Sequence, residues 1–217
     1  MRAIAIGVIV IALLWFLYYS EFNTMQFGQY KVHRTTVDPE GSAAMFAELD
    51  RRIGVLERHL SDKYGCGDGL GGQCNRGAQL VNPRTDHELF TDIIKKYNMH
   101  DRMTQLLENY NGARFSEISP NNVLGNTSFT EGKGRKIVMC LRNKAGQLHD
   151  VNTIMFVTLH EITHVMNDQW GHELYFWGLF RIVLQEAVEC GIYEPVDYAR
   201  RPKAYCGIMI TQNPLYL

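Results

Sequence analysis

The sequence carries almost no net charge, and it has neither an internal repeat nor a low-complexity tract. Its 22 basic and 23 acidic residues leave a formal charge of −1. This balance excludes a strongly basic nucleic-acid binder of the usual kind and gives no strong sign of nucleic-acid binding. Because hydrophobic residues make up 46% of the 217 residues, a disordered acidic chain is excluded as well. The length allows one domain of ordinary size plus an appendage.

Cysteine is scarce. The chain has five cysteines and no C-x-x-C pair, so the sequence does not indicate a structural zinc site made of thiolates. Since five is an odd number, at least one thiol stays free or pairs with another chain. We expect Cys140, Cys190 and Cys206 to be buried thiols rather than nucleophiles, because none belongs to a recognisable Cys–His arrangement. The number and spacing of the cysteines do not indicate the cellular compartment of the protein.

Charged residues are missing from residues 3–19. As a helix this run would span about 25 Å, just enough to cross a thin bilayer. Aromatic residues gather at its end, where they favour the level of the lipid headgroups, and no small-residue cleavage site follows. The sequence therefore predicts an uncleaved N-terminal membrane anchor in residues 1–20 and a tether in residues 21–40. A cleaved signal peptide and a core helix are the alternatives. The protein would be a single-pass membrane protein, with the side of the membrane left open.

Residues 41–217 are predicted to form one α+β domain. Apolar residues recur at helical spacing in residues 41–64, 86–97, 101–110, 150–167 and 172–190. Short segments rich in β-branched or aromatic residues predict a small antiparallel sheet from residues 113–118, 127–130 and 136–141. A glycine-rich stretch, residues 65–77, follows a helix rather than a strand, so it indicates a mobile loop and not a phosphate-binding turn.

Residues 160–164 read His-Glu-Ile-Thr-His, a complete H-E-x-x-H motif. On a helix, positions i and i+4 share one face, so His160 and His164 can bind one metal ion. Glu161 lies about 100° round the helix axis, where it can act as a general base as in zinc hydrolases. A chain of this composition, with 8 histidines, matches the motif by chance only about 0.02 times. The motif therefore favours a zinc ion (Zn²⁺) over a pair of core histidines.

A third protein ligand is expected, because catalytic zinc usually has three. His172 lies eight residues after His164. Gly171 permits the sharp turn that would bring His172 back to the metal ion. We favour His172 as the third ligand. The alternatives are Glu186 and Glu189, which a second packed helix could supply, and Asp168.

The run from Thr158 to His164, together with Gly171-His172 and Phe176-Trp177, resembles the WLM-type zincin metallopeptidases, relatives of the SprT-like group. The resemblance covers residues 114–193. It implies a zincin-like metallopeptidase domain with a small sheet beside the active-site helix. It also implies that the zinc ligands are His160, His164 and His172 and that Glu161 is catalytic. The closing segment, residues 191–207, is similar to that of related proteins encoded by large DNA viruses.

The resemblance further implies that a strand beside the active-site helix binds the substrate as an added strand, for which residues 136–141 are the candidate. An oxyanion stabiliser should exist, and Tyr193, Tyr198 and Tyr205 are candidates between which the sequence does not choose. The expected function is that of a membrane-anchored zinc metallopeptidase acting on a protein or peptide substrate. The alternatives are a catalytically silent, zinc-stabilised interaction domain displayed at a membrane and a hydrolase of non-peptide substrates.

Overall fold

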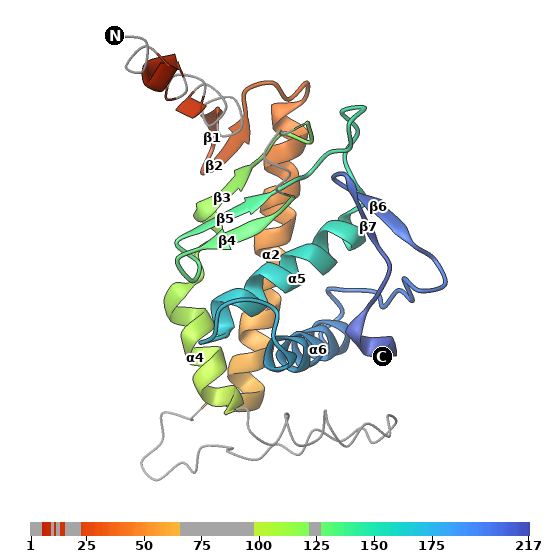
Figure 1. Ribbon diagram of the computed structural model, residues 1–217. Helices are drawn as coiled ribbons and strands as arrows, with labels where there is room; N and C mark the ends of the chain where they lie inside the picture. The colour runs from red at the N-terminus through yellow and green to blue at the C-terminus, as the bar shows by residue number, and fades with distance from the viewer. Residues whose placement is uncertain (1–5, 10, 12–13, 16–22, 66–97, 122–126) are drawn as a thin grey trace.

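The structure is a computed structural model that describes residues 6–9, 11, 14–15, 23–65, 98–121 and 127–217. In these residues a mixed α/β fold places one five-stranded sheet beside helices α2, α4, α5 and α6 (Figure 1). The strands of this sheet are β1 (Thr24–Phe27), β2 (Tyr30–His33), β3 (Phe115–Glu117), β4 (Phe129–Glu131) and β5 (Lys136–Met139). The helices are α2 (Pro39–Tyr64), α4 (Met99–Asn109), α5 (Val151–Met166) and α6 (Leu174–Glu189). The hairpin of β6 (Lys203–Tyr205) and β7 (Ile208–Ile210) and the 3-10 helices η1 (Gly112–Arg114) and η2 (Pro214–Tyr216) complete the described part.

The five-stranded sheet is mixed, whereas the sequence predicted a small antiparallel sheet. Its strand order is β1-β2-β3-β5-β4. The pairs β1–β2 and β4–β5 are antiparallel, while β2–β3 and β3–β5 are parallel. The sequence does not show this arrangement, because strands that follow one another in the chain need not be neighbours in the sheet. Strand β4 follows β3 in the sequence, yet it occupies the outer edge and leaves β3 to pair with β5.

Strands β1 and β2 lie in the segment that was predicted to be a tether, residues 21–40. They form a hairpin whose turn contains Gly28 at a φ of 59°. Tyr30 and Val32 of β2 are buried, and β2 joins the main sheet beside β3. The folded unit therefore includes residues well before the predicted domain start at residue 41. Strands of four residues show too few alternations for a period of two to stand out in the sequence.

The predicted N-terminal transmembrane helix is wrong, and so is the single-pass membrane location. No helix among the described residues is long and apolar enough to cross a membrane. The described residues of the predicted anchor, 6–9, 11 and 14–15, are helical and exposed. The uncharged run of the sequence, residues 3–19, stands at the short end of the range of lengths that a membrane-spanning helix needs, which is about 20 apolar residues.

Helix α2 confirms the amphipathic helix predicted for residues 41–64. It begins where the sequence places a cap, because the Asp38 carboxylate accepts a hydrogen bond of 2.8 Å from the Gly41 amide and Pro39 occupies the first turn. Its buried face consists of apolar residues three or four positions apart: Phe46, Leu49, Ile53, Leu56 and Leu60. Burial of each such side chain contributes about 1.5–3 kcal/mol, which fixes this helix against the sheet.

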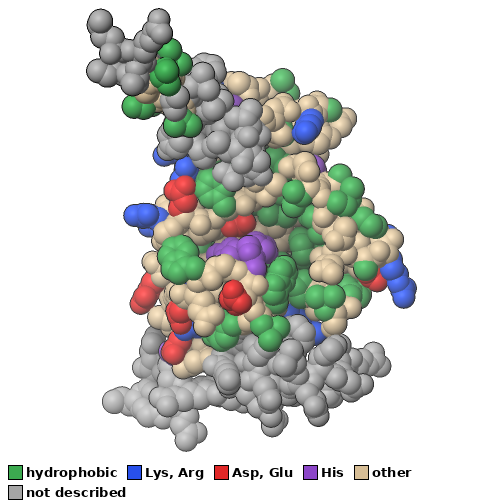
Figure 2. Space-filling model, viewed as in Figure 1, with side chains coloured by type: hydrophobic (Ala, Val, Ile, Leu, Met, Phe, Trp, Pro, Cys, Tyr) green, Lys and Arg blue, Asp and Glu red, His purple; other side chains and the backbone are tan. Residues whose placement is uncertain are grey.

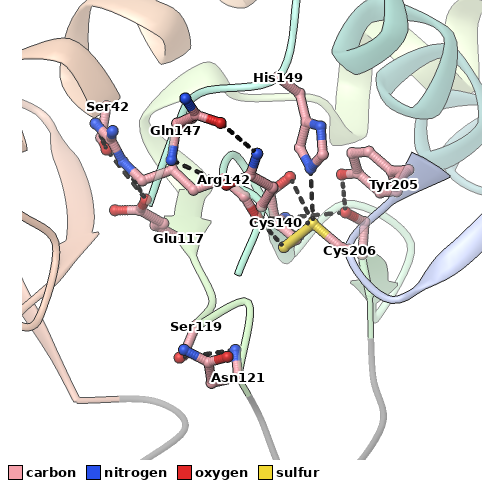
Figure 3. The surroundings of a disulfide bond; sticks show 12 residues. Ser42, Glu117, Ser119, Asn121, Cys140, Arg142, Gln147, His149, Tyr205 and Cys206 are labelled. Carbon is pink, nitrogen blue, oxygen red and sulfur yellow. Dashed lines mark hydrogen bonds and ion pairs between the residues drawn. A yellow bond between two sulfur atoms is a disulfide. The ribbon is translucent and has the colours of Figure 1, made fainter. Parts of the chain in front are cut away.

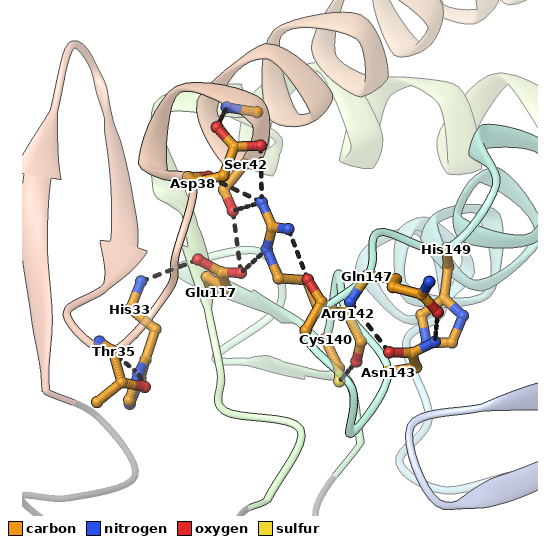
Figure 4. A network of polar contacts seen from close by, with 12 residues as sticks. His33, Thr35, Asp38, Ser42, Glu117, Cys140, Arg142, Asn143, Gln147 and His149 are labelled. Atoms are coloured by element: carbon orange, nitrogen blue, oxygen red, sulfur yellow. Dashed lines mark hydrogen bonds and ion pairs between the residues drawn. The ribbon is translucent and has the colours of Figure 1, made fainter.

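A buried polar network joins the start of α2 to the sheet (Figure 4). The Arg142 guanidinium donates to the Asp38 carbonyl at 2.8 Å and to the Ser42 hydroxyl at 3.2 Å, and it lies 3.7 Å from the Glu117 carboxylate. Burial raises the pKa of Glu117, while a hydrogen bond from the His33 amide opposes this shift. Because a buried charge is costly unless it is paired, this network holds the hairpin, α2 and β3 in one arrangement.

Helices α5 and α6 confirm the predictions for residues 150–167 and 172–190, with their ends displaced by one or two residues. The Asp150 side chain caps α5 by accepting from the Thr153 amide at 2.9 Å. Helix α6 begins at Leu174, which leaves His172 in the loop between the two helices. Helix α4 confirms the prediction for residues 101–110. The predicted helix at residues 86–97 and the glycine-rich pattern after residue 65 lie outside the described residues.

Candidate metal centre

The helix α5 and the loop that follows it bring three histidines together. His160 and His164 are one turn apart on α5. Gly171 has a φ of 85°, a conformation that favours glycine, and it turns the loop so that His172 faces the helix. The Nε2 atom of His172 lies 2.8 Å from that of His160 and 3.1 Å from that of His164. The structure therefore places the third predicted ligand beside the first two.

These three side chains fit a zinc ion. Tetrahedral zinc, with Zn–N bonds of about 2.0–2.1 Å, separates two nitrogen ligands by about 3.4 Å. The imidazoles of His160, His164 and His172 would have to move apart by only about half an ångström. Burial and the neighbouring histidines lower the pKa of His160 to about 3 and that of His164 to about 4. The imidazoles are therefore neutral at pH 7, which is the form that binds a metal ion.

Glu161 lies beside the histidines in a buried position, with 3% of its surface exposed. Burial raises the pKa of its carboxyl to about 7. The Thr130 hydroxyl of β4 donates to the Glu161 carboxylate at 2.9 Å, and this hydrogen bond opposes the rise in pKa. A carboxyl group with a pKa near the working pH is well suited to accept and return a proton. Among the described residues no Lys or Arg forms an ion pair with Glu161, so its carboxylate is not neutralised by a cation.

Aromatic side chains of α6 hold the imidazole rings. The Phe176 ring stacks on the ring of His164, with centroids 4.4 Å apart, and meets His160 edge-on at 4.8 Å. Trp177 lies 5.9 Å from His172. Phe176 is fully buried, so it restricts how the two helix-borne imidazoles turn. The aromatic pair noted in the sequence thus lies directly against the candidate metal centre, which we define as His160, His164 and His172.

The alternative third ligands lie elsewhere. The Asp168 carboxylate is 2.6 Å from the Arg102 guanidinium of α4. Glu186 is buried on the side of α6 that faces α2, where it accepts hydrogen bonds from Lys63 and from the other α2 side chains His59 and Tyr64. Glu189 is 2.7 Å from the same Lys63 ammonium. Each of these carboxylates therefore already has a cationic partner away from His160 and His164.

A cavity of about 270 Å³ opens onto the three histidines, with Ser128 and the first two residues of β4 on one side and residues 170–172 on the other. Figure 2 shows histidine side chains at the middle of this face, with hydrophobic side chains around them. Strand β4 is one of the two edge strands of the sheet, whereas β5 pairs on both sides. The substrate strand predicted at residues 136–141 is therefore wrong, because β5 has no free edge. Strand β4 lies at the end of the sheet and borders the cavity.

Thr130 and Lys133, which the sequence analysis did not single out, both contact α5 from the sheet. Thr130 bonds to Glu161, and the Lys133 ammonium contacts the carbonyl oxygens of Asn167 and His164 at the end of the helix. Both residues reach the metal centre only because β4 and the turn after it lie beside α5. The local sequence of this short strand, which is flanked by glycines, does not indicate that it packs beside α5.

Two of the three cysteines predicted to be buried thiols form a disulfide, so that prediction was wrong for Cys140 and Cys206 (Figure 3). They are 66 residues apart in the sequence, and their Cα atoms are 6.2 Å apart. Cys190 is a free thiol. The error arose because sequence spacing does not show which cysteines meet in space. The disulfide fastens the β6–β7 hairpin to the end of β5.

Tyr205 is the candidate tyrosine that lies near the metal centre. Tyr205 directly precedes Cys206 (Figure 3). It borders a cavity together with Glu161, and its hydroxyl is 2.7 Å from the Ser128 hydroxyl. Tyr193 and Tyr198 instead pack against Phe156, with ring centroids 6.0 and 5.0 Å away. The structure thus separates the three tyrosines that the sequence could not.

The chain is similar to viral proteins. It is 29% identical over 177 residues to an uncharacterized protein of Acanthamoeba polyphaga mimivirus, which covers 81% of this chain and 74% of that protein. It is 38% identical over 115 residues to an uncharacterized protein of Invertebrate iridescent virus 6, covering 52% of this chain and 56% of that protein. A protein of Invertebrate iridescent virus 3 is 32% identical over 96 residues, covering 40% and 58%. No protein-family model matches the chain, and no solved structure matches it significantly.

Proposed function

We propose that the protein is a zinc-dependent metallopeptidase. The observation that carries this proposal is the convergence of His160, His164 and His172 beside a buried carboxyl group, Glu161. Three neutral imidazoles and an adjacent glutamate are the groups that zinc hydrolases use. The resemblance to WLM-type zincins agrees with the same assignment. The viral relatives carry no activity in their names, so the proposal rests on the site.

The three histidines would hold the zinc ion. A zinc ion bound there would act as a Lewis acid that polarises a carbonyl group and lowers the pKa of a water molecule to about 7. Glu161 would act as the general base, accept a proton from water at its carboxylate and return it to the departing amine. Thr130 would keep the Glu161 carboxylate in one orientation through its hydrogen bond.

The edge strand favours a peptide over other substrates. Strand β4 lies at the end of the sheet and borders the cavity at the metal centre. An extended peptide can pair with such an edge through main-chain hydrogen bonds, which bring its backbone across the catalytic groups. A metal centre for small non-peptide substrates has no need of this edge.

The rival function is a catalytically silent domain in which zinc only stabilises the fold. Such a domain needs the three histidines but has no use for Glu161. Keeping a carboxyl group buried with a raised pKa is costly, so a silent domain would be better served by an apolar residue at this position. Glu161 therefore favours the enzyme.

The test uses purified wild-type protein and the variants Glu161→Gln and His172→Ala. Zinc per chain is measured by mass spectrometry, and cleavage of an unfolded protein such as casein is followed by gel electrophoresis. We expect about one zinc per wild-type chain, weakened binding in His172→Ala, and full zinc without cleavage in Glu161→Gln. Wild-type protein that holds zinc and cleaves nothing would support the silent domain. Full zinc affinity in His172→Ala would overturn the third ligand.

A further inference from the structure

Ser128 lines the cavity of about 270 Å³ that opens onto the three histidines. It lies two residues before Thr130, whose hydroxyl donates to Glu161, and both residues line this cavity. Ser128 is half-buried, so the protein surrounds its side chain without removing it from the cavity. Its hydroxyl group can therefore contact a ligand that lies between the histidines and Glu161.

Two neighbouring groups occupy the acceptor positions of the Ser128 oxygen. The backbone amide of Cys140 donates to Ser128 Oγ at 3.0 Å, and the Tyr205 hydroxyl lies 2.7 Å from the same atom. Between the two hydroxyls the phenol is the better donor, because it is far more acidic than an alcohol. A serine oxygen has two lone pairs, and these two donors fill them. The O–H group of Ser128 is then left to donate to a third atom.

Tyr205 is fixed behind Ser128 and away from the cavity. It is only 1% exposed and does not line the 270 Å³ cavity. Burial raises the pKa of Tyr205, so the phenol keeps its proton at neutral pH. Tyr205 directly precedes Cys206, which forms the disulfide with Cys140 (Figure 3). The two donors to Ser128 therefore belong to segments that are joined covalently, and Ser128 is the hydroxyl that reaches the cavity.

The other hydroxyl and ammonium groups that line this cavity already use their donors. The Thr130 hydroxyl donates to Glu161. The Lys133 ammonium has three N–H groups and contacts three carbonyl oxygens, those of His164, Asn167 and Gln169. Among the described hydroxyl and ammonium groups of the cavity, Ser128 alone therefore has an O–H or N–H group for a ligand.

We propose that Ser128 is a catalytic residue that donates a hydrogen bond to the carbonyl oxygen of the peptide bond that is cut, and that Tyr205 is its positioning residue. The inference rests on the proposed peptidase function and deepens it. When water adds to the carbonyl carbon, one water proton passes to Glu161 and an electron pair of the C=O bond moves to the oxygen. As that pair returns, the C–N bond breaks and Glu161 gives the proton to the amine. Ser128 keeps its proton and stabilises the charged oxygen between the two steps.

The first test is kinetic and compares Ser128→Ala with Ser128→Thr, which keeps a hydroxyl group. Zinc content and the urea unfolding midpoint verify that each variant is folded. Because the donated hydrogen bond strengthens as charge develops on the oxygen, we expect kcat of Ser128→Ala to fall about a hundredfold while KM changes less than about threefold. Ser128→Thr should recover about tenfold of this loss or more. Glu161-dependent cleavage with an unchanged kcat in Ser128→Ala would overturn the role of Ser128.

A double-mutant cycle separates the two hydroxyl groups. If Tyr205 acts through Ser128, Tyr205→Phe lowers kcat about tenfold in the wild-type chain and has no further effect in a chain that already carries Ser128→Ala. If the Tyr205 hydroxyl contacted the substrate itself, the two losses would multiply, which would overturn its positioning role. The matched control is Tyr193→Phe, which removes the hydroxyl of another buried tyrosine, one that accepts from Asn213 at 3.0 Å. Its kcat should equal that of the wild type.

The second test measures binding and needs no catalysis. Zinc-loaded protein is titrated in a calorimeter with methylphosphonate, whose tetrahedral oxyanion imitates the charged oxygen, and with ethanethiol, whose sulfur is a weak acceptor. We expect Ser128→Ala to bind methylphosphonate about tenfold more weakly than the wild type, because a hydrogen bond to a charged group is lost, and to bind ethanethiol equally well. Methylphosphonate that binds both proteins equally, or neither of them, would overturn the donor.

The two tests distinguish this inference from the proposed function. Phosphonate binding that depends on Ser128, in a protein that cleaves nothing, would overturn the peptidase function and leave the Ser128 donor standing. Cleavage that depends on Glu161 and is indifferent to Ser128→Ala would overturn the donor and leave the peptidase function standing.

Discussion

The Lys133 ammonium lies 2.8 Å from the carbonyl oxygen of Gln169. The same ammonium contacts the Asn167 carbonyl at the end of α5 and lies 4.6 Å from the centre of the Trp170 ring. A cation at the carboxyl end of a helix is favourable because the last carbonyl groups there lack partners. Lys133 therefore fastens the loop that carries His172, although it contacts none of the three histidine side chains in the described structure.

Replacing Lys133 should weaken zinc binding. In Lys133→Met the loop carbonyls lose their donor, His172 is held less firmly, and we expect zinc affinity to fall by about tenfold. Affinity is measured by competition with a chromophoric chelator, and the absorption spectrum of the cobalt-loaded protein reports the ligand geometry. The matched control is Lys203→Met, which removes an ion pair of 2.7 Å with Asp150 at the opposite end of α5. Equal affinities in the two variants would contradict a positioning role for Lys133.

Removing the Thr130 hydroxyl should change the pH dependence of cleavage. The hydrogen bond from Thr130 stabilises the charged form of Glu161 and lowers its pKa, so Thr130→Val should raise that pKa. The acidic limb of the kcat/KM profile then moves to higher pH, and kcat/KM at pH 7 falls severalfold because more of Glu161 is protonated. Thr130→Ser keeps a hydroxyl and should restore the profile. A limb that moves to lower pH would contradict this account.

Glu186 should matter for stability and not for zinc. It is buried between α2 and α6 and accepts from Lys63 at 2.9 Å and from Tyr64 at 2.6 Å. Glu186→Ala leaves the buried Tyr64 hydroxyl without its acceptor and removes a carboxylate from Lys63 and His59, so we expect the free energy of unfolding to fall by about 2–3 kcal/mol. Glu189→Ala removes an exposed partner of Lys63 and should cost less than about 1 kcal/mol. Urea unfolding measures both values, and zinc content should stay at the wild-type level.

The disulfide should contribute measurably to stability. Closing a loop between residues 66 positions apart removes entropy from the unfolded chain that corresponds to about 4 kcal/mol. We therefore expect the double variant Cys140→Ser, Cys206→Ser to unfold at lower urea concentration than the wild type. Reduced wild-type protein should match it, while Cys190→Ser should change little, because Cys190 is a free thiol. Equal stability of oxidised and reduced wild-type protein would contradict the bond's contribution.

The sequence predicted the parts of the fold that have a local signal. Helix α2 repeats its apolar residues over about four turns, from Phe46 to Leu60, and the histidine pair on α5 is set by a spacing of four residues. The pairing of β2 with β3 joins residues far apart in the chain, and so does the disulfide. Neither the strand pairing nor the disulfide produces a periodic pattern in the sequence. Thr130 and Lys133 belong to the same class, since their roles exist only once β4 lies beside α5.

The edge position of β4 has a consequence for what the proposed enzyme could cut. A polypeptide can add itself to an edge only if its own backbone amides and carbonyls are free. In a folded protein most of these groups are already engaged in helices or in sheets. The substrates of the proposed enzyme would therefore be proteins with an unfolded segment, such as an unfolded terminus or a damaged region. Pairing with β4 would then select unfolded segments, and correctly folded proteins would not be cleaved even in the absence of an inhibitor.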